Sequence, residues 1–195
     1  VFESFPKNIK FKKFGFAKIK PNIGIKKDLV KKLSFKNKKD LLIKDRKDAG
    51  ALKVKKKYLQ KNYKLYANLL LKNGYVKIAE ELVEDNIYPY VVMHILNDKK
   101  TKELIWHRDQ YFHGRNFIGP KFKLYKLAIY LQDTNQNNGV TGFIPKFISP
   151  RFRNKYLDTI FAYLSSFLSI HPRLSIGEAV IFSGKVMHHR PKQKN

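Results

Sequence analysis

Residues 104–109 read Leu-Ile-Trp-His-Arg-Asp, an apolar stretch that runs directly into a His-x-Asp triplet. A second apolar stretch, residues 177–188, opens with Gly-Glu and ends at His188. In an extended chain residues i and i+2 point to the same side, so His107 and Asp109 can reach one ion while Arg108 points away. Two imidazoles and one carboxylate form the facial triad typical of non-haem Fe(II) sites. The two stretches together predict a β protein that assembles a metal site from distant strands.

Each half of this pattern is weak when taken alone. The chain has six histidines, so a His-x-Asp triplet arises readily by chance, and a single histidine at the end of a strand is more often structural. The order of the motifs is more informative than either half. His189 competes with His188, because strand alternation turns only one of them inward, and the spacing from Phe182 favours His188. His113 and His171 are interpreted as loop residues.

The second half of the chain is rich in short strand signals. Asn137-Asn138-Gly139 is a turn signal, Pro145 closes the strand that follows it, and we expect residues 124–131 and 140–144 to form a hairpin around the turn. The predicted strands are residues 87–96, 104–106, 124–131, 140–144, 178–182 and 186–188. Residues 154–170 carry apolar side chains at helical spacing and predict a helical insertion, either a cover for the core or a substrate lid.

The first half is mainly helical in character. Residues 11–20 alternate and predict a strand, whereas residues 26–72 and 76–83 carry apolar residues at helical spacings. Helices followed by many short strands favour a β-barrel or sandwich with a helical flank. We therefore expect a single domain, with residues 1–86 as a lysine-rich helical flank and residues 87–195 as the β core. The chain begins at Val1 and ends within a motif, which we interpret as truncation at both ends.

Composition limits the alternatives. The chain has 41 basic and 15 acidic residues and a formal net charge of +26, and lysine far outnumbers arginine. The first 64 residues hold most of the excess, so the predicted metal site lies in the less basic part. The chain has no cysteine, which excludes disulfides, thiolate metal sites and cysteine nucleophiles. No apolar run reaches the roughly 18 residues of a membrane span, and no secretory signal is visible, so we expect a cytoplasmic protein.

In three segments the sequence resembles the phytanoyl-CoA dioxygenase family of Fe(II)- and 2-oxoglutarate-dependent oxygenases. The matching segments are residues 106–109 (Trp-His-Arg-Asp), residues 130–145, from Tyr-Leu-Gln-Asp through Asn-Gly to Pro, and residues 177–188. Residues 14–19 (Phe-Gly-Phe-Ala-Lys-Ile) are a weaker match to the opening strand of the family. The resemblance implies a double-stranded β-helix, or jelly roll, with His107, Asp109 and His188 as iron ligands.

The resemblance also implies cosubstrate residues. The family arginine that binds the far carboxylate of 2-oxoglutarate would fall beyond Asn195, so Lys126 and Arg190 are the candidates for this cofactor-binding role. His94 matches a position that lines the cosubstrate pocket. Independently of the resemblance, Gln110 and Tyr111 follow the first ligand pair directly and are candidates for substrate contact, with packing at the pocket rim as the alternative. The chain departs from the family in having residues 145–148 as Pro-Lys-Phe-Ile instead of Pro-Gly-Ser-His.

The function implied is hydroxylation of a small organic substrate, with Fe(II) as cofactor, 2-oxoglutarate as cosubstrate, and release of succinate and carbon dioxide. The alternative is a non-catalytic basic module that binds nucleic acid or an anionic glycan by counterion release. Despite its His-Arg-Asp triplet, the sequence lacks the Gly-rich loop and Asp-Phe-Gly of protein kinases, and it has no P-loop or dinucleotide fingerprint.

Overall fold

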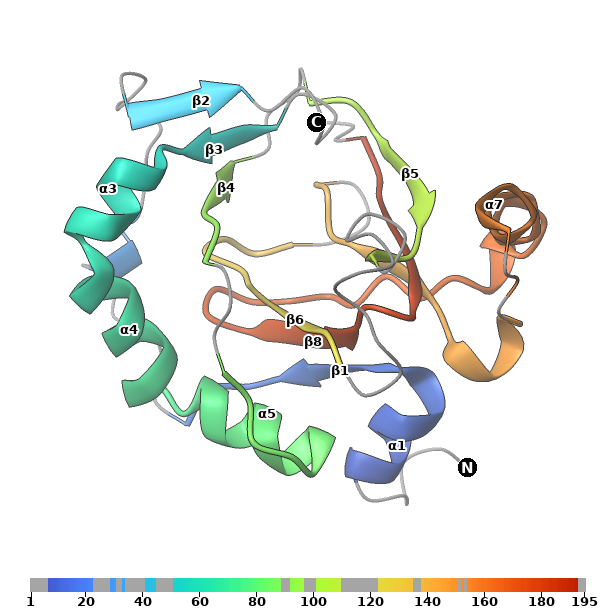
Figure 1. Ribbon diagram of the computed structural model, residues 1–195, viewed down its shortest axis with the longest axis horizontal. Helices are drawn as coiled ribbons and strands as arrows, with labels where there is room; N and C mark the ends of the chain where they lie inside the picture. The colour runs from blue at the N-terminus through green and yellow to red at the C-terminus, as the bar shows by residue number, and fades with distance from the viewer. Residues whose placement is uncertain are drawn as a thin grey trace.

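The computed structural model describes residues 7–22, 29–30, 33, 41–44, 51–88, 92–96, 101–109, 123–134, 138–150, 152 and 154–192. The described residues form three small antiparallel sheets, and helices line the outer faces (Figure 1). The described part of the chain is therefore built on β-sheets with flanking helices, as the order of sequence patterns predicts.

Two of the sheets build the core. The first has the order β1-β8-β6 and consists of β1 (Phe16–Ile19), β8 (Ala179–Ser183) and β6 (Tyr125–Ile129). The second has the order β5-β9-β7 and consists of β5 (Leu104–His107), β9 (Met187–Arg190) and β7 (Gly142–Ile144). A third sheet lies at the rim (Figure 1) and joins β2 (Leu42–Lys44), β3 (Leu52–Val54) and β4 (Ile95–Leu96). In each of the two core sheets, the central strand comes from the C-terminal part of the chain.

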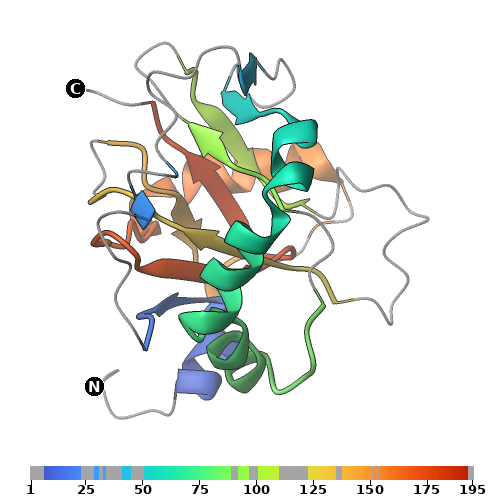
Figure 2. The same cartoon turned by 90° about the vertical axis from the view of Figure 1, so that its left-hand side faces the viewer.

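The helices form two groups. Helices α3 (Lys56–Lys61), α4 (Tyr63–Lys72) and α5 (Tyr75–Val83) follow one another down one side, and α1 (Lys7–Phe14) lies beside α5 (Figures 1 and 2). Helix α7 (Lys155–Leu164) lies on the opposite side and packs on β5. Two short 3-10 helices, η3 (Lys146–Ile148) and η4 (Ser166–Leu168), complete the described elements.

Strand β8 is buried on both faces, which explains the continuous apolar run at residues 179–182. Ala179 and Ile181 face the cluster formed with the helices, whereas Val180 and Phe182 face a second cluster with Val140, Phe143, Leu174 and Val186. Alternate residues of a strand point to opposite faces, so a strand covered on both sides has no polar face. Phe143 is fully buried and stacks on Phe16 with ring centroids 4.6 Å apart, which joins the two core sheets.

Several sequence predictions are wrong in detail. The predicted hairpin does not form between the strands at residues 124–131 and 140–144, because β6 pairs with β8 and β7 pairs with β9. The turn at Asn138-Gly139 instead leads the chain from one sheet to the other.

Residues 11–14, predicted as a strand, form the end of helix α1. Gly15, at a φ of 79°, donates its N–H to the Phe11 carbonyl (2.7 Å) and stops the helix.

The N-terminal region contains more strand than the sequence predicts: β1 lies within the strand predicted at residues 11–20, but further strands follow it. Strand β1 pairs with β8 inside a core sheet, and β2 and β3 interrupt the predicted helical stretch of residues 26–72. The predicted strand at residues 87–96 is strand only at Ile95–Leu96 within the described residues. The short segments carry too few residues for their period to show in the sequence.

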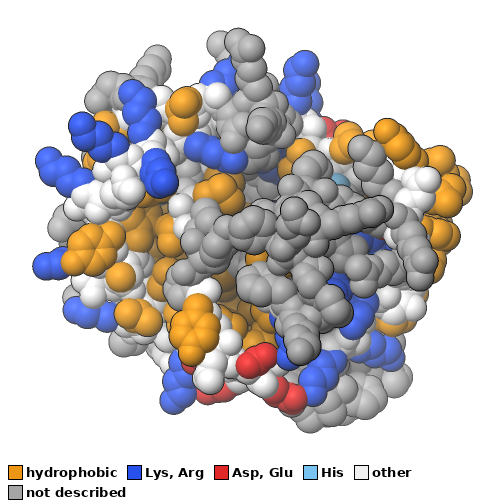
Figure 3. Space-filling view, in the orientation of Figure 1, with side chains coloured by type: hydrophobic (Ala, Val, Ile, Leu, Met, Phe, Trp, Pro, Cys, Tyr) orange, Lys and Arg blue, Asp and Glu red, His pale blue; other side chains and the backbone are white. Residues whose placement is uncertain are grey.

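Helix α7 presents an unusual surface. Its buried side includes Asp158 and Ala162, and most of its large apolar side chains face solvent. The exposed apolar residues of α7 and η4 are Tyr156, Leu157, Ile160, Tyr163, Leu164, Phe167 and Leu168. Hydrophobic side chains accordingly gather at the edge of the molecule where α7 lies (Figure 3). Among the described helices, none combines the length and apolar character required to cross a membrane.

Candidate metal centre

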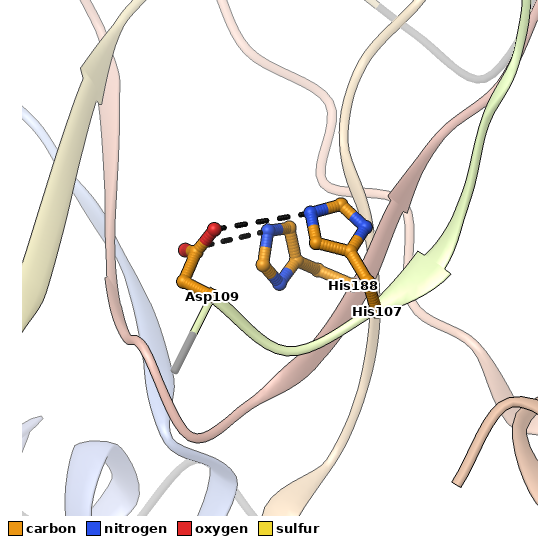
Figure 4. Close-up of side chains that lie close together, drawn as sticks. All are labelled: His107, Asp109 and His188. Carbon is orange, nitrogen blue, oxygen red and sulfur yellow. Dashed lines mark ion pairs between the residues drawn. The ribbon is translucent and has the colours of Figure 1, made fainter. Parts of the chain in front are cut away.

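The structure brings His107, Asp109 and His188 together. His107 ends β5, Asp109 lies two residues further on, and His188 lies in β9 directly opposite His107. The Nε2 atom of His107 is 3.8 Å from Asp109 Oδ1, and that of His188 is 3.6 Å from Asp109 Oδ2 (Figure 4). One ligand atom from each residue lies within 4.8 Å of the other two. Three donors from two strands and the turn after β5 thus face a common point.

Backbone carbonyls orient both imidazoles. The Nδ1 atom of His107 lies 2.7 Å from the Ile105 carbonyl oxygen, and Nδ1 of His188 lies 2.9 Å from the Val186 carbonyl oxygen. A carbonyl can only accept, so Nδ1 carries the proton and donates in each ring. This tautomer leaves the lone pair on Nε2, the atom turned toward Asp109. The same use of the second ring nitrogen is typical of metal-binding histidines.

The site is buried, and burial controls the charge of His188. Desolvation lowers the pKa of His188 to about 3, a shift that the nearby Asp109 carboxylate only partly opposes. The ring is therefore neutral at physiological pH, which is the form that binds a metal. Asp109 behaves differently: burial acts to raise its pKa, but His188, Lys126 and His107 together outweigh burial and hold the pKa below its usual value.

The carboxylate of Asp109 has one paired and one unpaired oxygen. Lys126, on β6, donates to Oδ1 at 2.6 Å. Oδ2 is buried and has no hydrogen-bond partner among the described residues. A buried carboxylate oxygen without a partner is costly unless a ligand completes it. A metal cation between Oδ2 and the two Nε2 atoms would remove that cost, so the residues present fit an Fe(II) ion.

Arg108 points away from the triad, as strand alternation predicts. Its side chain is 1% exposed and forms a two-point ion pair with Asp158 of α7, at 2.9 Å from Nε to Oδ2 and 3.3 Å from Nη2 to Oδ1. Nη2 also donates to Ser149 Oγ and to the Pro150 carbonyl, and Nη1 donates to the Lys185 carbonyl. Sequence reasoning did not identify Asp158. The signal was the single acidic residue of a mainly apolar helix.

His189 faces the opposite side of β9 from His188. Its ring stacks on Trp106 with centroids 4.0 Å apart, and His171 meets it edge-on at 5.2 Å. Gly142 leaves room for both rings, since a Cβ there would lie 2.5 Å from His189 Nε2 and from His171 Cε1. Desolvation lowers the pKa of His189 to about 4, so this ring is also neutral. Of the two adjacent histidines, only His188 faces Asp109.

The other candidate residues lie in different places. His94 precedes β4, and its Nδ1 lies 3.1 Å from the hydroxyl of Tyr66 on α4. Arg190 is buried on β9, opposite Leu104 of β5. Gln110, Tyr111 and His113 lie outside the described residues. The cofactor and substrate roles assigned to these residues remain predictions.

Comparisons with known proteins find the same fold in solved structures. No protein-family model and no curated protein matches the sequence. Among solved structures, the chain is similar to AviO1 from Streptomyces viridochromogenes Tue57, at 18% identity over 97% of this chain and 87% of AviO1, with a TM-score of 0.67. It is similar to the α-ketoglutarate-dependent carbocyclase SnoK of nogalamycin biosynthesis, at 16% identity over 99% of this chain and 80% of SnoK, with a TM-score of 0.73.

A third similar structure is EctD from S. alaskensis with bound Fe, at 16% identity over 97% of this chain and 71% of EctD, with a TM-score of 0.70. EctD has also been solved with 2-oxoglutarate and 5-hydroxyectoine. At these identities the likeness establishes a shared fold. That fold is consistent with the resemblance to the phytanoyl-CoA dioxygenase family.

Proposed function

We propose that this protein is an Fe(II)- and 2-oxoglutarate-dependent oxygenase with a double-stranded β-helix, and that it hydroxylates a small organic substrate. The observation that carries the proposal is the convergence of His107, Asp109 and His188, with one buried carboxylate oxygen that no described residue satisfies. The fold shared with SnoK and EctD supports the same chemistry. His107, Asp109 and His188 are the proposed iron ligands and the catalytic centre.

The chain's own residues would prepare the site in three ways. The two neutral imidazoles present Nε2, held in place by the Ile105 and Val186 carbonyls. The carboxylate of Asp109 would neutralise one of the two positive charges of the metal ion. Three protein ligands on one face leave the remaining positions open for a keto-acid and dioxygen. When bound, iron and 2-oxoglutarate supply the oxidising chemistry, with release of succinate and carbon dioxide.

Lys126 is the proposed partner for the far carboxylate of 2-oxoglutarate. It lies at the triad and is partly exposed, and its ammonium already binds a carboxylate oxygen there. A metal on Oδ2 would leave Lys126 on Oδ1, and an ammonium has three donors, so Lys126 would still have donors for a second anion. Arg190 is the alternative cation; it lies on β9 two residues after His188. His94 stays a weaker candidate for the pocket wall.

The test is succinate release from 2-oxoglutarate by the purified chain with added Fe(II) and dioxygen, measured without a prime substrate as uncoupled turnover. Anaerobic titration calorimetry with Fe(II) gives metal binding independently. Wild-type protein should bind one Fe(II) and release succinate above background, and His107→Ala should lose both. The matched control, His171→Ala, changes a histidine outside the triad and should keep both. Absence of metal binding and of turnover in wild-type protein would refute the proposal.

The alternative function, a basic module that binds nucleic acid or glycan, gains no support from the compared structures. The two functions make opposite predictions for His107→Ala. Polyanion binding should survive this substitution and weaken steeply with salt, because it depends on counterion release from lysines.

A further inference from the structure

We infer that Arg108 is a positioning residue, which with Asp158 of α7 sets the geometry of the three metal ligands. This inference rests on the proposed function, since it assigns a role in building the metal site. It concerns a residue that touches neither metal nor substrate. Its side chain extends from between His107 and Asp109 into the protein, and at 1% exposure it is among the most buried side chains described.

The contacts of Arg108 link three separate segments. Asp158 belongs to α7, Ser149 and Pro150 follow η3, and Lys185 lies in the turn between β8 and β9. The carbonyl of Lys185 is three residues before His188. One guanidinium therefore connects the backbone that carries His107 and Asp109 with the turn that leads to the third ligand.

Rigidity at this point matters because β5 and β9 are not in perfect register. The pairing shifts between Leu104 and His107, so the ladder that brings His107 opposite His188 is irregular just before the ligand. Asp109 lies beyond the strand, where no sheet hydrogen bonds support it. Arg108 supplies the missing support through a planar group whose donors have a fixed direction.

The buried ion pair is poorly explained by stability alone. Both partners, Arg108 and Asp158, are about 1% exposed, and moving two charges out of water costs much of what their attraction returns. A pair of apolar residues of similar volume can stabilise such a position equally well. An apolar pair at these positions cannot donate hydrogen bonds to Ser149, Pro150 and Lys185. Replacing the ion pair with apolar residues therefore tests the positioning role separately from the contribution of the buried charges to stability.

The experiment compares wild-type protein with the double variant Arg108→Met/Asp158→Leu. The first readout is Co(II) affinity by titration calorimetry, together with the visible absorption of bound Co(II), which reports ligand geometry. The second readout is the thermal midpoint of the metal-free protein. A positioning role predicts Co(II) binding weakened about 10- to 100-fold and a changed Co(II) spectrum. The thermal midpoint should fall as well, because the variant leaves the Ser149 hydroxyl and the Pro150 and Lys185 carbonyls without their donor, so affinity and spectrum are compared at a temperature where both proteins are folded.

The control is a second ion pair, Lys18 with Glu178, which joins β1 to the start of β8 away from the triad. Lys18→Met should lower the thermal midpoint and leave Co(II) affinity and spectrum unchanged. If the double variant does not fold, Asp158→Asn decides the question, because it keeps the shape of Asp158 and removes the charge. It should weaken Co(II) binding several-fold.

The outcomes separate the two proposals. Wild-type protein that binds Co(II), with a folded variant that binds it equally tightly and with the same spectrum, would overturn the positioning role and leave the proposed function standing. The positioning role would also be overturned if Co(II) affinity fell in proportion to thermal stability in every variant, in Lys18→Met as well as in the Arg108 variants. Wild-type protein that binds no Co(II) would overturn both proposals.

Discussion

His107 and His188 lie directly opposite each other on neighbouring antiparallel strands, and their ring centroids are 4.3 Å apart. Strand pairing thus brings together two residues that are far apart in the sequence. A one-residue slip of β9 would exchange His188 for His189 at this position, because successive side chains of a strand point to opposite faces. The proposed metal centre therefore depends on the register of two short strands.

The adjacent histidines should differ sharply in their effect on metal binding. Mutation of a residue that only supports a metal ligand typically weakens metal binding by about 10- to 100-fold. His188→Ala removes a ligand itself, so we expect it to weaken Fe(II) binding by more than about 100-fold. His189→Ala should bind within a few-fold of wild type, because that ring faces Trp106. Anaerobic calorimetry measures both. Equal losses in the two variants would contradict the assignment of His188.

Lys126→Met should weaken 2-oxoglutarate binding by about 10- to 100-fold, which corresponds to the roughly 1.5–3 kcal/mol of a hydrogen bond to a charged group. Fe(II) affinity should change much less, because Lys126 binds Oδ1 and the proposed metal-binding atom is Oδ2. Titration of the Fe(II)-loaded protein with 2-oxoglutarate measures the effect. Arg190→Met is the comparison variant. A loss confined to Arg190→Met would transfer the carboxylate-binding role to that residue.

His94 should make stability depend on pH. Desolvation lowers its pKa from 6.5 to about 4 in the folded protein. Between about pH 4 and 6.5 the unfolded chain binds this proton and the folded protein does not, so acidification over that range destabilises the fold. His94→Phe should flatten the decline in unfolding free energy by at most about 1.4 kcal/mol per pH unit.

Urea denaturation at several pH values in this range measures that slope. Tyr66→Phe is the control, since it removes the hydroxyl that contacts His94 and keeps the titrating ring. Its slope should match that of wild type. Parallel slopes for His94→Phe and wild type would show that another group carries the pH dependence.

Two phenylalanines at opposite extremes of burial test the core. Phe143→Ala should cost about 3–5 kcal/mol of unfolding free energy, because Phe143 is fully buried between Phe16 and Phe182. Phe167→Ala should change stability by no more than about 0.5 kcal/mol, because its side chain is 81% exposed. Chemical denaturation measures both. Similar costs at the two positions would mean that the exposed face of α7 is covered in solution.

Local sequence patterns predicted the strands that carry the site. The strands at β5, β6 and β8 follow from β-branched and aromatic runs, and the His-x-Asp spacing correctly turned Arg108 away from His107 and Asp109. The pairing of β7 was wrong, because an Asn-Gly turn favours a hairpin locally and cannot reveal that the chain passes to another sheet. The Arg108–Asp158 pair was also beyond prediction, since it joins residues 50 positions apart through packing of α7.

The amino-acid sequence by itself determined which side chains were available for metal binding and which strands carried them, because ligand type and strand alternation are local properties. The spacing from Phe182 favoured His188 over His189, but only the tertiary structure placed His188 beside Asp109 and brought Lys126 to the same carboxylate. The physical reason is strand register: it depends on hydrogen bonds and buried side chains from distant segments, which no local pattern specifies.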